Sequence, residues 1–168
     1  MSAVQWGDVA TWVSGLATTA AVGFAGLQLR EFRKRDASDR RIELAGVTVE
    51  WKLDELPGPP APDGTAESTY IFTLHNPGRL PVTHVSVLVN LPITVQRILT
   101  DGTPDAPGQD FELDTPVVAG GGSRQWWRTL RFAQADTGGL RNMTAVVRFR
   151  DLDGNDHENR WGRPYGSG

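Results

Sequence analysis

The sequence predicts a mainly β protein, an antiparallel β-sandwich preceded by a single N-terminal transmembrane α-helix. Two observations support this fold class. Residues 9–29 contain no charged side chain, although 22 % of the 168 residues are charged. After residue 45, short segments alternate apolar and polar side chains and are separated by turns rich in glycine and proline, which is the pattern of half-buried strands.

The composition removes several classes of function. The chain contains no cysteine, so disulfide scaffolds, thiolate zinc sites, iron–sulfur clusters and cysteine nucleophiles are excluded. Its formal net charge is −3, which disfavours a broadly cationic nucleic-acid binder, and we expect no nucleic-acid partner.

The N-terminal element is predicted to span a bilayer over residues 9–29, after a short external N-terminus at residues 1–8. A helix of that length rises about 31 Å, close to the roughly 30 Å of a hydrocarbon core. Tryptophan favours the headgroup region, and basic side chains close the other end of the span. The predicted membrane-interface anchors are Trp6, Trp12, Arg30, Arg33, Lys34 and Arg35.

Charge after the span predicts its orientation. Residues 1–8 contain no Lys or Arg, unlike a cleaved signal peptide, whereas residues 30–44 contain six and form a basic juxtamembrane helical linker. The prediction is a single-pass protein of the cell membrane, in contact with lipid, whose C-terminal domain is cytoplasmic. Residues 9–29 also contain several threonines and glycines, so a soluble or interfacial helix is the alternative.

Small residues recur at four-residue spacing along the predicted span, at Gly15, Thr19 and Gly23. Rows of small residues let two helix backbones approach closely in lipid. They predict a homo-oligomer formed through the helix, or docking on another span. The alternative is that a helix rich in alanine and glycine contains such rows by chance.

The first strands of the domain at residues 45–168 follow from period-two alternation. Residues 47–54 place valine, tryptophan and leucine at alternate positions, and Leu56–Glu67 is predicted to be a loop rich in proline and glycine. Residues 69–75 form the next strand, and Asn76-Pro77-Gly78 turns the chain. Residues 82–91 alternate again until Pro92, which is expected to break the strand, and residues 93–99 give a short edge strand.

The remaining strands are shorter or interrupted. Pro116 lies within residues 111–118, so an edge position is expected for that strand. Residues 124–132 and 142–150 are two further strands. Asp153-Gly154 is typical of a tight hairpin turn, and residues 157–161 return from it. About eight short strands that each bury one face favour two packed sheets.

Two segments carry a resemblance. The run Asn76-Pro77-Gly78-Arg79-Leu80-Pro81-Val82 before an alternating valine strand resembles the second and third strands of immunoglobulin-like domains in bacterial membrane-anchored proteins of unassigned function. The ending Phe149-Arg150-Asp151-Leu152-Asp153-Gly154, with Trp161 after it, is similar to their last hairpin. The resemblance covers the β domain, lacks the disulfide of antibody domains, and implies an immunoglobulin-like β-sandwich that binds other proteins and carries no catalytic residue.

Candidate chemistry is sparse, and we predict no enzyme. The sequence places no third metal ligand beside His75, His84 or His157, and we expect these histidines to be exposed or to lie at turns. Asp151–Asp156 alternates carboxylates like a calcium loop but lacks its glycine and its closing glutamate, so a hairpin turn is expected. No lysine follows Gly120-Gly121-Gly122, as a phosphate loop requires. We therefore expect no catalytic residue, no cofactor and no metal.

One surface stands out as an interaction site. If Trp126 faces the core, Trp127 stands outside, and an exposed tryptophan among arginines is typical of a binding hot spot. The predicted protein-interaction residues are Trp127, Arg124, Arg128, Arg131, Arg148 and Arg150. The same residues suit anionic lipid or a single nucleic-acid strand. A buried tryptophan pair straddling a bulge, with solvated arginines, is the alternative.

The sequence thus favours a single-pass membrane-anchored, non-catalytic protein-interaction module with a cytosolic β-sandwich domain, whose partner is another protein. Three alternatives stay open. The domain is displayed on the cell surface, the chain is a soluble self-assembling structural protein, or the sheets enclose a ligand-binding or enzymatic cleft.

Overall fold

The computed structural model describes residues 28, 30–31, 34 and 38–162. The chain divides between Ile42 and Glu43 into two compact units, and the second unit contains the β domain. The predicted span and its packing residues Gly15, Thr19 and Gly23 lie outside the described residues. The anchors Trp6, Trp12, Arg33 and Arg35 lie outside them as well.

The described part of the N-terminal segment is helical. Arg30 and Lys34 belong to it and have exposed side chains, and residues 38–45 continue as a helix. Among the residues that the structure describes, no helix combines the length and the apolar character that a membrane crossing needs.

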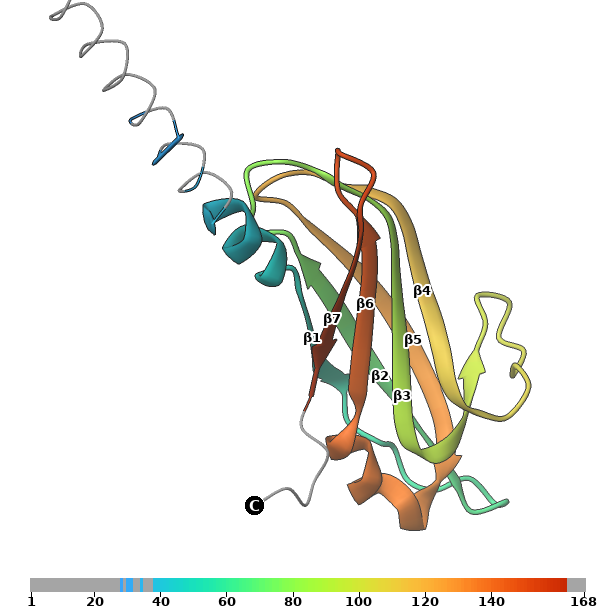
Figure 1. Cartoon of the computed structure of the whole chain (residues 1–168). Helices are drawn as coiled ribbons and strands as arrows, with labels where there is room; N and C mark the ends of the chain where they lie inside the picture. The colour runs from blue at the N-terminus through green and yellow to red at the C-terminus, as the bar shows by residue number, and fades with distance from the viewer. Residues whose placement is uncertain (1–27, 29, 32–33, 35–37, 163–168) are drawn as a thin grey trace, which may run out of the picture. The chain divides into compact units, whose positions relative to one another are not determined.

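The β domain contains seven strands and one 3-10 helix, all strand pairs being antiparallel, and the predicted mainly β class is confirmed (Figure 1). The elements are β1 (Thr48–Glu55), β2 (Thr65–His75), β3 (Val82–Ile98), β4 (Gly108–Val118), β5 (Ser123–Ala133), η1 (Gln134–Asn142), β6 (Thr144–Arg150) and β7 (Asp156–Trp161).

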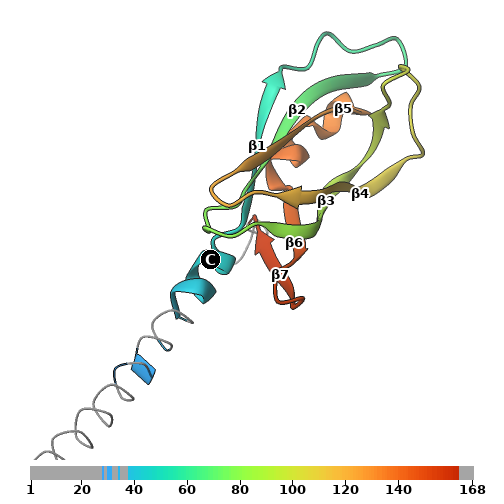
Figure 2. The same ribbon diagram turned by 90° about the horizontal axis from the view of Figure 1, so that it is seen from above.

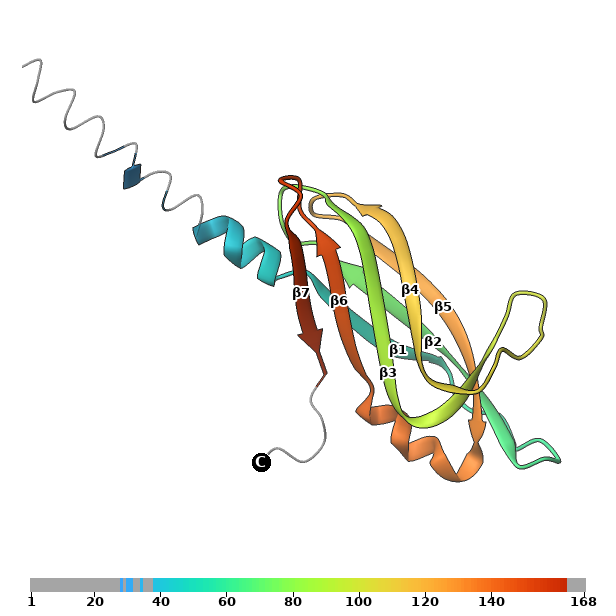
Figure 3. The same ribbon diagram turned by 45° about the vertical axis from the view of Figure 1, so that its right-hand side comes forward.

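The strands form two layers that share β3. The first layer contains β1, β2, β5 and residues 96–98 of β3. The second layer contains β4, residues 82–90 of β3, β6 and β7. Because β3 passes from one layer to the other, the hydrogen-bonded sheet is continuous and curls over itself, as two further views show (Figures 2 and 3).

The core lies between the layers and is built from the inward side chains of both. Phe72 of β2 packs edge-on against Phe111 of β4, with ring centroids 5.5 Å apart. Val87 and Val147, on neighbouring strands of the second layer, are fully buried. The predicted alternation is therefore confirmed for β3 and β6, whose inward side chains are buried, whereas in β2 the outward Ile71 and Thr73 are buried as well.

The hairpin between β6 and β7 forms as predicted, and so does the edge position of the strand with Pro116. Gly154 takes a φ of 84° in the hairpin turn, a value that glycine adopts without strain. β4 pairs only with β3 among the described strands, so Pro116 lies at an edge where its missing N–H does not interrupt a ladder.

The predicted break at Pro92 is wrong. β3 runs through Pro92 for 17 residues, so the two strands predicted on either side are one. The pairing of β3 with β4 shifts between Asn90 and Val95, and the exposed Pro92 falls within that irregular stretch. A residue without an N–H is tolerated where the ladder is interrupted, and here β3 changes layers.

Two other local predictions need correction. The loop predicted over Leu56–Glu67 ends earlier, because β2 begins at Thr65. The Asp63 carboxylate accepts hydrogen bonds from the N–H and the hydroxyl of Thr65, which closes the turn before the strand. The 3-10 helix η1 was not expected; it connects β5 to β6 and buries Leu140.

The first residues of the second unit are bonded to the rest of the β domain. Asn159 of β7 donates its side-chain N–H groups to the carbonyl oxygens of Leu44 and Val47, at 2.9 and 3.0 Å. The Glu43 carboxylate accepts a hydrogen bond from the backbone N–H of Arg79, in the turn before β3. Residues 43–47 are therefore held by two separate parts of the domain before β1 begins.

Candidate protein-interaction surface

The strand β5 carries the candidate surface, and its two edges differ. Along one edge it pairs with β2 over its whole length, from Ser123 to Ala133. Along the other edge it pairs with β3 only at residues 129–131. Among the described strands, residues 123–128 therefore have a neighbour on one side only, and alternate backbone N–H and C=O groups there face no strand.

The two faces of β5 are of opposite character. Trp126, Leu130 and Phe132 point into the core and are buried. Trp127 points to the outer face of the first layer, and 54 % of its surface is exposed, against 6 % for Trp126. The predicted exposure of Trp127 is therefore observed, and the two tryptophans do not form a buried pair.

Trp127 lies in a ladder of cross-strand pairs between β2 and β5. Its partner in register is Ile71, whose side chain is buried although it lies on the outer face. The neighbouring cross-strand pairs on the same face are polar, and the two side chains of each pair lie within hydrogen-bond distance of one another. They are the hydroxyls of Thr69 and Thr129, 3.0 Å apart, and Gln125 Nε2 with Thr73 Oγ1, 3.3 Å apart.

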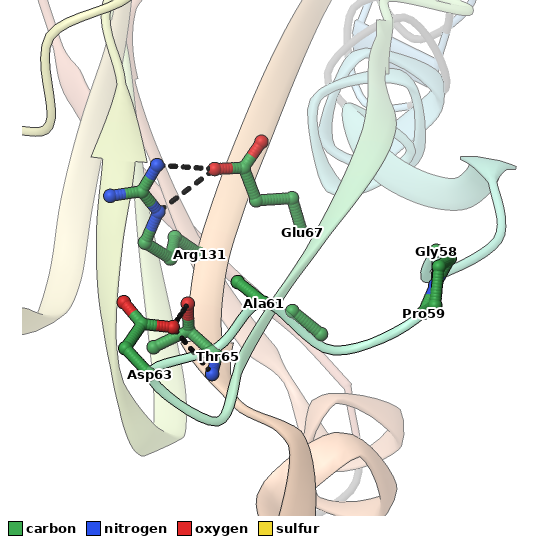
Figure 4. A pocket seen from close by; sticks show the side chains of 8 residues that line it. Gly58, Pro59, Ala61, Asp63, Thr65, Glu67 and Arg131 are labelled. Carbon is green, nitrogen blue, oxygen red and sulfur yellow. Dashed lines mark hydrogen bonds and ion pairs between the residues drawn. The ribbon is translucent and has the colours of Figure 1, made fainter.

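A shallow cavity of about 310 Å³ lies at the end of this ladder (Figure 4). The loop before β2 forms one wall with Gly58, Pro59 and Ala61, and Glu67 and Arg131 form the other. Arg131 Nε donates to Glu67 Oε1 at 2.8 Å. Hydrogen bonds from the side chain and backbone of Thr65 lower the pKa of Asp63. The charged side chains that line the cavity are therefore bonded to other residues of the same domain, which suits a structural role for them.

The core-facing side of β5 also carries a cation, Arg128. Its side chain is partly buried, and Nη1 donates to the carbonyl oxygen of Trp127 at 2.8 Å. Tyr70 is its partner in register on β2. Burial lowers the pKa of Arg128, and the positive charge of Arg97 lowers it further. Burial likewise raises the pKa of Tyr70.

Arg97 itself is neutralised, whereas Arg128 is not. The Arg97 guanidinium forms an ion pair with Asp105 and lies 5.8 Å from the ring centroid of Phe111. Among the described residues, no carboxylate forms an ion pair with Arg128 or with the exposed Arg124. The core-facing side of the free β5 edge therefore carries two cations that have no acidic partner within the described part of the chain.

The structure does not gather the predicted arginines around Trp127. Arg124 and Arg128 share the parity of Trp126, so they lie on the opposite side of β5 from Trp127, and Arg131 alone shares its face. Arg148 and Arg150 belong to β6 in the second layer. Their part in binding stays a prediction, and the surface to test is β5 itself.

The arginines of β6 are paired directly across the hairpin. Arg148 Nε lies 3.0 Å from Glu158 Oε2, and Arg150 Nε lies 2.9 Å from Asp156 Oδ1. The Asp156 hydrogen bond raises the pKa of Arg150, and the same bond lowers the pKa of Asp156. These four side chains form a mutually neutralised outer face on the hairpin.

Two of the three histidines, His75 and His157, and the acidic turn have local partners. His75 Nε2 lies 3.3 Å from Glu50 Oε1, and His157 Nε2 lies 3.1 Å from Asp151 Oδ2. The buried Asp151 carboxylate accepts backbone hydrogen bonds from Asp153 and Asn155, which organise the turn. Within the described residues, no group of three His, Asp or Glu side chains is arranged to hold a metal ion.

Sequence reasoning missed Arg97 and Tyr70 as neighbours of Arg128. Strand alternation could have placed Arg128 on the core-facing side, because it lies two residues from Trp126. Arg97 approaches it only because β3 crosses between layers and pairs Arg97 with Leu130. No local sequence pattern predicts that β3 crosses between the layers, so the sequence carried no signal that Arg97 lies near Arg128.

Comparisons with known proteins show no family for this chain. No protein-family model matches the chain, and no curated protein sequence matches it. Its structural neighbours are β-rich domains. The protein named ApaA from Bordetella pertussis is 13 % identical with a TM-score of 0.42, covering 71 % of this chain and 95 % of that one. The ASH/PapD-like domain of human CEP192 is 15 % identical with a TM-score of 0.31, covering 70 % and 82 %.

An enzyme structure is also similar over a limited part. The GH20 exo-β-N-acetylglucosaminidase from Vibrio harveyi is 15 % identical with a TM-score of 0.40, and the match covers 68 % of this chain but 18 % of the enzyme. Similarity at these identities and TM-scores carries no assignment of function, and the immunoglobulin-like resemblance stays a prediction.

Proposed function

We propose that this chain is a single-pass membrane-anchored, non-catalytic protein-interaction module whose β domain lies in the cytosol. The anchoring rests on the uncharged residues 9–29 and the basic residues that follow them. The binding rests on β5, where a large aromatic side chain is exposed in the middle of a regular strand.

The observation that carries the proposal is the environment of Trp127. Its neighbours along the ladder are polar pairs bonded to one another, so they do not bury its indole. Tryptophan is enriched at interface hot spots because it buries a large apolar area with little loss of side-chain freedom. A partner that covers Trp127 therefore removes apolar surface from water without breaking an internal bond.

Site-specific photo-crosslinking in intact cells tests the binding site. We expect a photoreactive residue in place of Trp127 to crosslink the full-length chain to a discrete partner protein. The matched control is the same residue in place of Arg160, a side chain that is 80 % exposed on β7. Equal crosslinking from both positions, or none from position 127, contradicts the proposed surface.

A topology reporter tests the location independently. A reporter active only in the cytosol, fused after Gly168, is expected to give a signal in cells, whereas one active only outside the cell is expected to give none. The reverse pattern supports the alternative of a surface-exposed domain. Recovery of the full-length chain without detergent supports the soluble alternative.

A further inference from the structure

The free edge of β5 combines two features that complement a particular kind of partner. Residues 123–128 pair with β2 alone among the described strands, so their other edge is open to a further strand. The Trp127 carbonyl oxygen accepts a hydrogen bond from Arg128 Nη1, and an added strand would take the place of this bond and release the guanidinium. Arg124 and Arg128 accompany that stretch without a carboxylate partner in the described part of the chain. An open strand edge selects extended backbone, and unpaired cations select acidic side chains.

We propose that the edge of β5 at residues 124–128 binds an extended acidic segment of a partner protein, which adds to the first layer as a further strand. This inference rests on the proposed function, because it assigns the chemistry of the partner to the same strand. Trp127 and the two arginines then contact opposite faces of the added segment.

The spacing of the cations suits an extended partner with carboxylates four residues apart. Arg124 and Arg128 lie four residues apart on the same side of a strand, a separation of about 13 Å at 3.3 Å per residue. Carboxylates at positions i and i+4 of an added strand match that separation. The same positions on a helix lie only about 6 Å apart, so one helix turn cannot serve both arginines.

The partial burial of Arg128 supports an acidic ligand over solvent alone. Arg97 lies close enough for its charge to disfavour the protonated guanidinium, and Asp105 is engaged with Arg97. A carboxylate that reaches Arg128 would relieve this repulsion and form a charge-assisted hydrogen bond. Tyr70, in register with Arg128, extends the same core-facing side.

A second copy of the chain is a poor occupant of this edge. Antiparallel pairing of two β5 strands centred on Trp126 would place Arg124 of one copy opposite Arg128 of the other. Parallel pairing in register would place each arginine opposite its equivalent. Like charges directly across a strand pair are destabilising, so the arginines disfavour self-association in these two registers.

Peptide binding to the solubilised full-length chain tests the inference. The probe is the fluorescent peptide Thr-Glu-Val-Thr-Val-Glu-Val-Thr, which places two glutamates four residues apart on one face and valines on the other. Two matched peptides replace both glutamates by lysine, or the central threonine by proline. We expect the acidic peptide to bind, its affinity to fall with salt, and both matched peptides to bind at least tenfold more weakly.

Charge reversal then locates the site. Arg128→Glu is expected to weaken binding of the acidic peptide about thirtyfold, and Arg124→Glu, at an exposed position, about fivefold. The double variant is expected to bind the lysine peptide more tightly than the acidic peptide. Arg160→Glu, a matched charge change on β7, leaves the affinity within about twofold. If Arg128→Glu loses its circular-dichroism spectrum, Arg124→Glu and the peptide series decide the outcome.

Three results overturn the inference: equal affinity for the acidic and lysine peptides, equal affinity for the proline peptide, or equal losses from Arg124→Glu and Arg160→Glu. The second result indicates an anion site that needs no strand. Crosslinking from position 127 separates this inference from the proposed function, since a partner captured there while the acidic peptide fails to bind removes only the inference.

Discussion

The strand β5 and the hairpin of β6 and β7 both present arginines, yet their arginines have different surroundings. On the hairpin, Arg148 stands opposite Glu158 and Arg150 opposite Asp156, and each pair forms an ion pair. On β5, Arg131 is likewise paired with Glu67 across the ladder, but Arg128 stands opposite Tyr70 and Arg124 stands opposite Leu74. The register of the neighbouring strand therefore decides which arginines are neutralised within the fold.

This difference distinguishes arginines whose charge is paired within the fold from arginines whose charge a binding partner can still pair. An arginine with a carboxylate across the ladder has its charge matched before any partner arrives, so a partner gains little from it. An arginine opposite an apolar or phenolic side chain can still form an ion pair with a carboxylate of a partner. The edge of β5 is therefore the better binding candidate, although the hairpin carries the same residue type.

The adjacent tryptophans of β5 give the largest expected contrast. Trp126→Ala should lower the free energy of unfolding by about 3–5 kcal/mol, because it opens a cavity in the core. Trp127→Ala should lower it by about 1 kcal/mol or less, because its side chain is exposed. Denaturant unfolding of the solubilised chain, followed by circular dichroism, measures both.

The control for this contrast is Trp126→Phe, which keeps an aromatic ring in the core and should cost less than Trp126→Ala. Comparable losses from Trp126→Ala and Trp127→Ala would show that both indoles are buried in solution. The assignment of Trp127 to a binding surface would then fail.

Asp151, at the end of β6, gives the next effect. Its burial raises the carboxyl pKa, but hydrogen bonds from Asn155, His157 and Asp153 outweigh burial and hold the pKa well below its ordinary value. The carboxylate therefore contributes its full stabilisation above about pH 5, and this contribution is lost as the pH falls through the unfolded-state pKa of about 4 toward the lower folded-state pKa. Asp151→Asn should lower the free energy of unfolding at pH 7 by about 2 kcal/mol.

Unfolding measured between pH 7 and pH 2 checks the sign. The wild-type chain should lose more stability than Asp151→Asn over the acidic part of that range, so the two curves converge. Asp54→Asn, which changes an exposed carboxylate of β1, is the matched control. Parallel curves for wild type and Asp151→Asn would show that this carboxylate does not organise the hairpin.

The fold was predictable where a local pattern fixes burial. The turn at Asp153-Gly154 is a property of adjacent residues, and its prediction is confirmed. The predicted alternation over residues 47–54 is confirmed at Val47 and Val49, which are buried, but not at Leu53, which is exposed near the end of β1. The passage of β3 through Pro92 was not predictable, because the tolerance of proline there depends on a pairing shift against β4. Nor did the polar segment of η1, which buries only Leu140, carry a periodic signal.

The site was predictable in part for the same reason. The opposite parity of Trp126 and Trp127 predicts that one is exposed, as observed. The grouping of Arg128 with Trp127 ignored that parity. The pairing of Arg148 and Arg150 with carboxylates depends on the register of β7, and the absence of a carboxylate opposite Arg128 depends on β2. These are properties of pairs of strands, which alternation along one strand does not reveal.

The smallest expected effect compares one arginine from each region. Arg128→Met should leave the melting temperature unchanged or raise it by about 1–2 °C, because it removes a partly buried cation beside Arg97 and keeps a long apolar side chain. Arg150→Met should lower it by a similar amount, because Asp156 loses its ion pair. Since both effects are electrostatic, the difference between the two variants should shrink in 1 M salt. A loss in Arg128→Met as large as that in Arg150→Met, persisting at high salt, would mean that the Arg128 guanidinium is already satisfied within the fold, and the charge of β5 would then be structural like that of the hairpin.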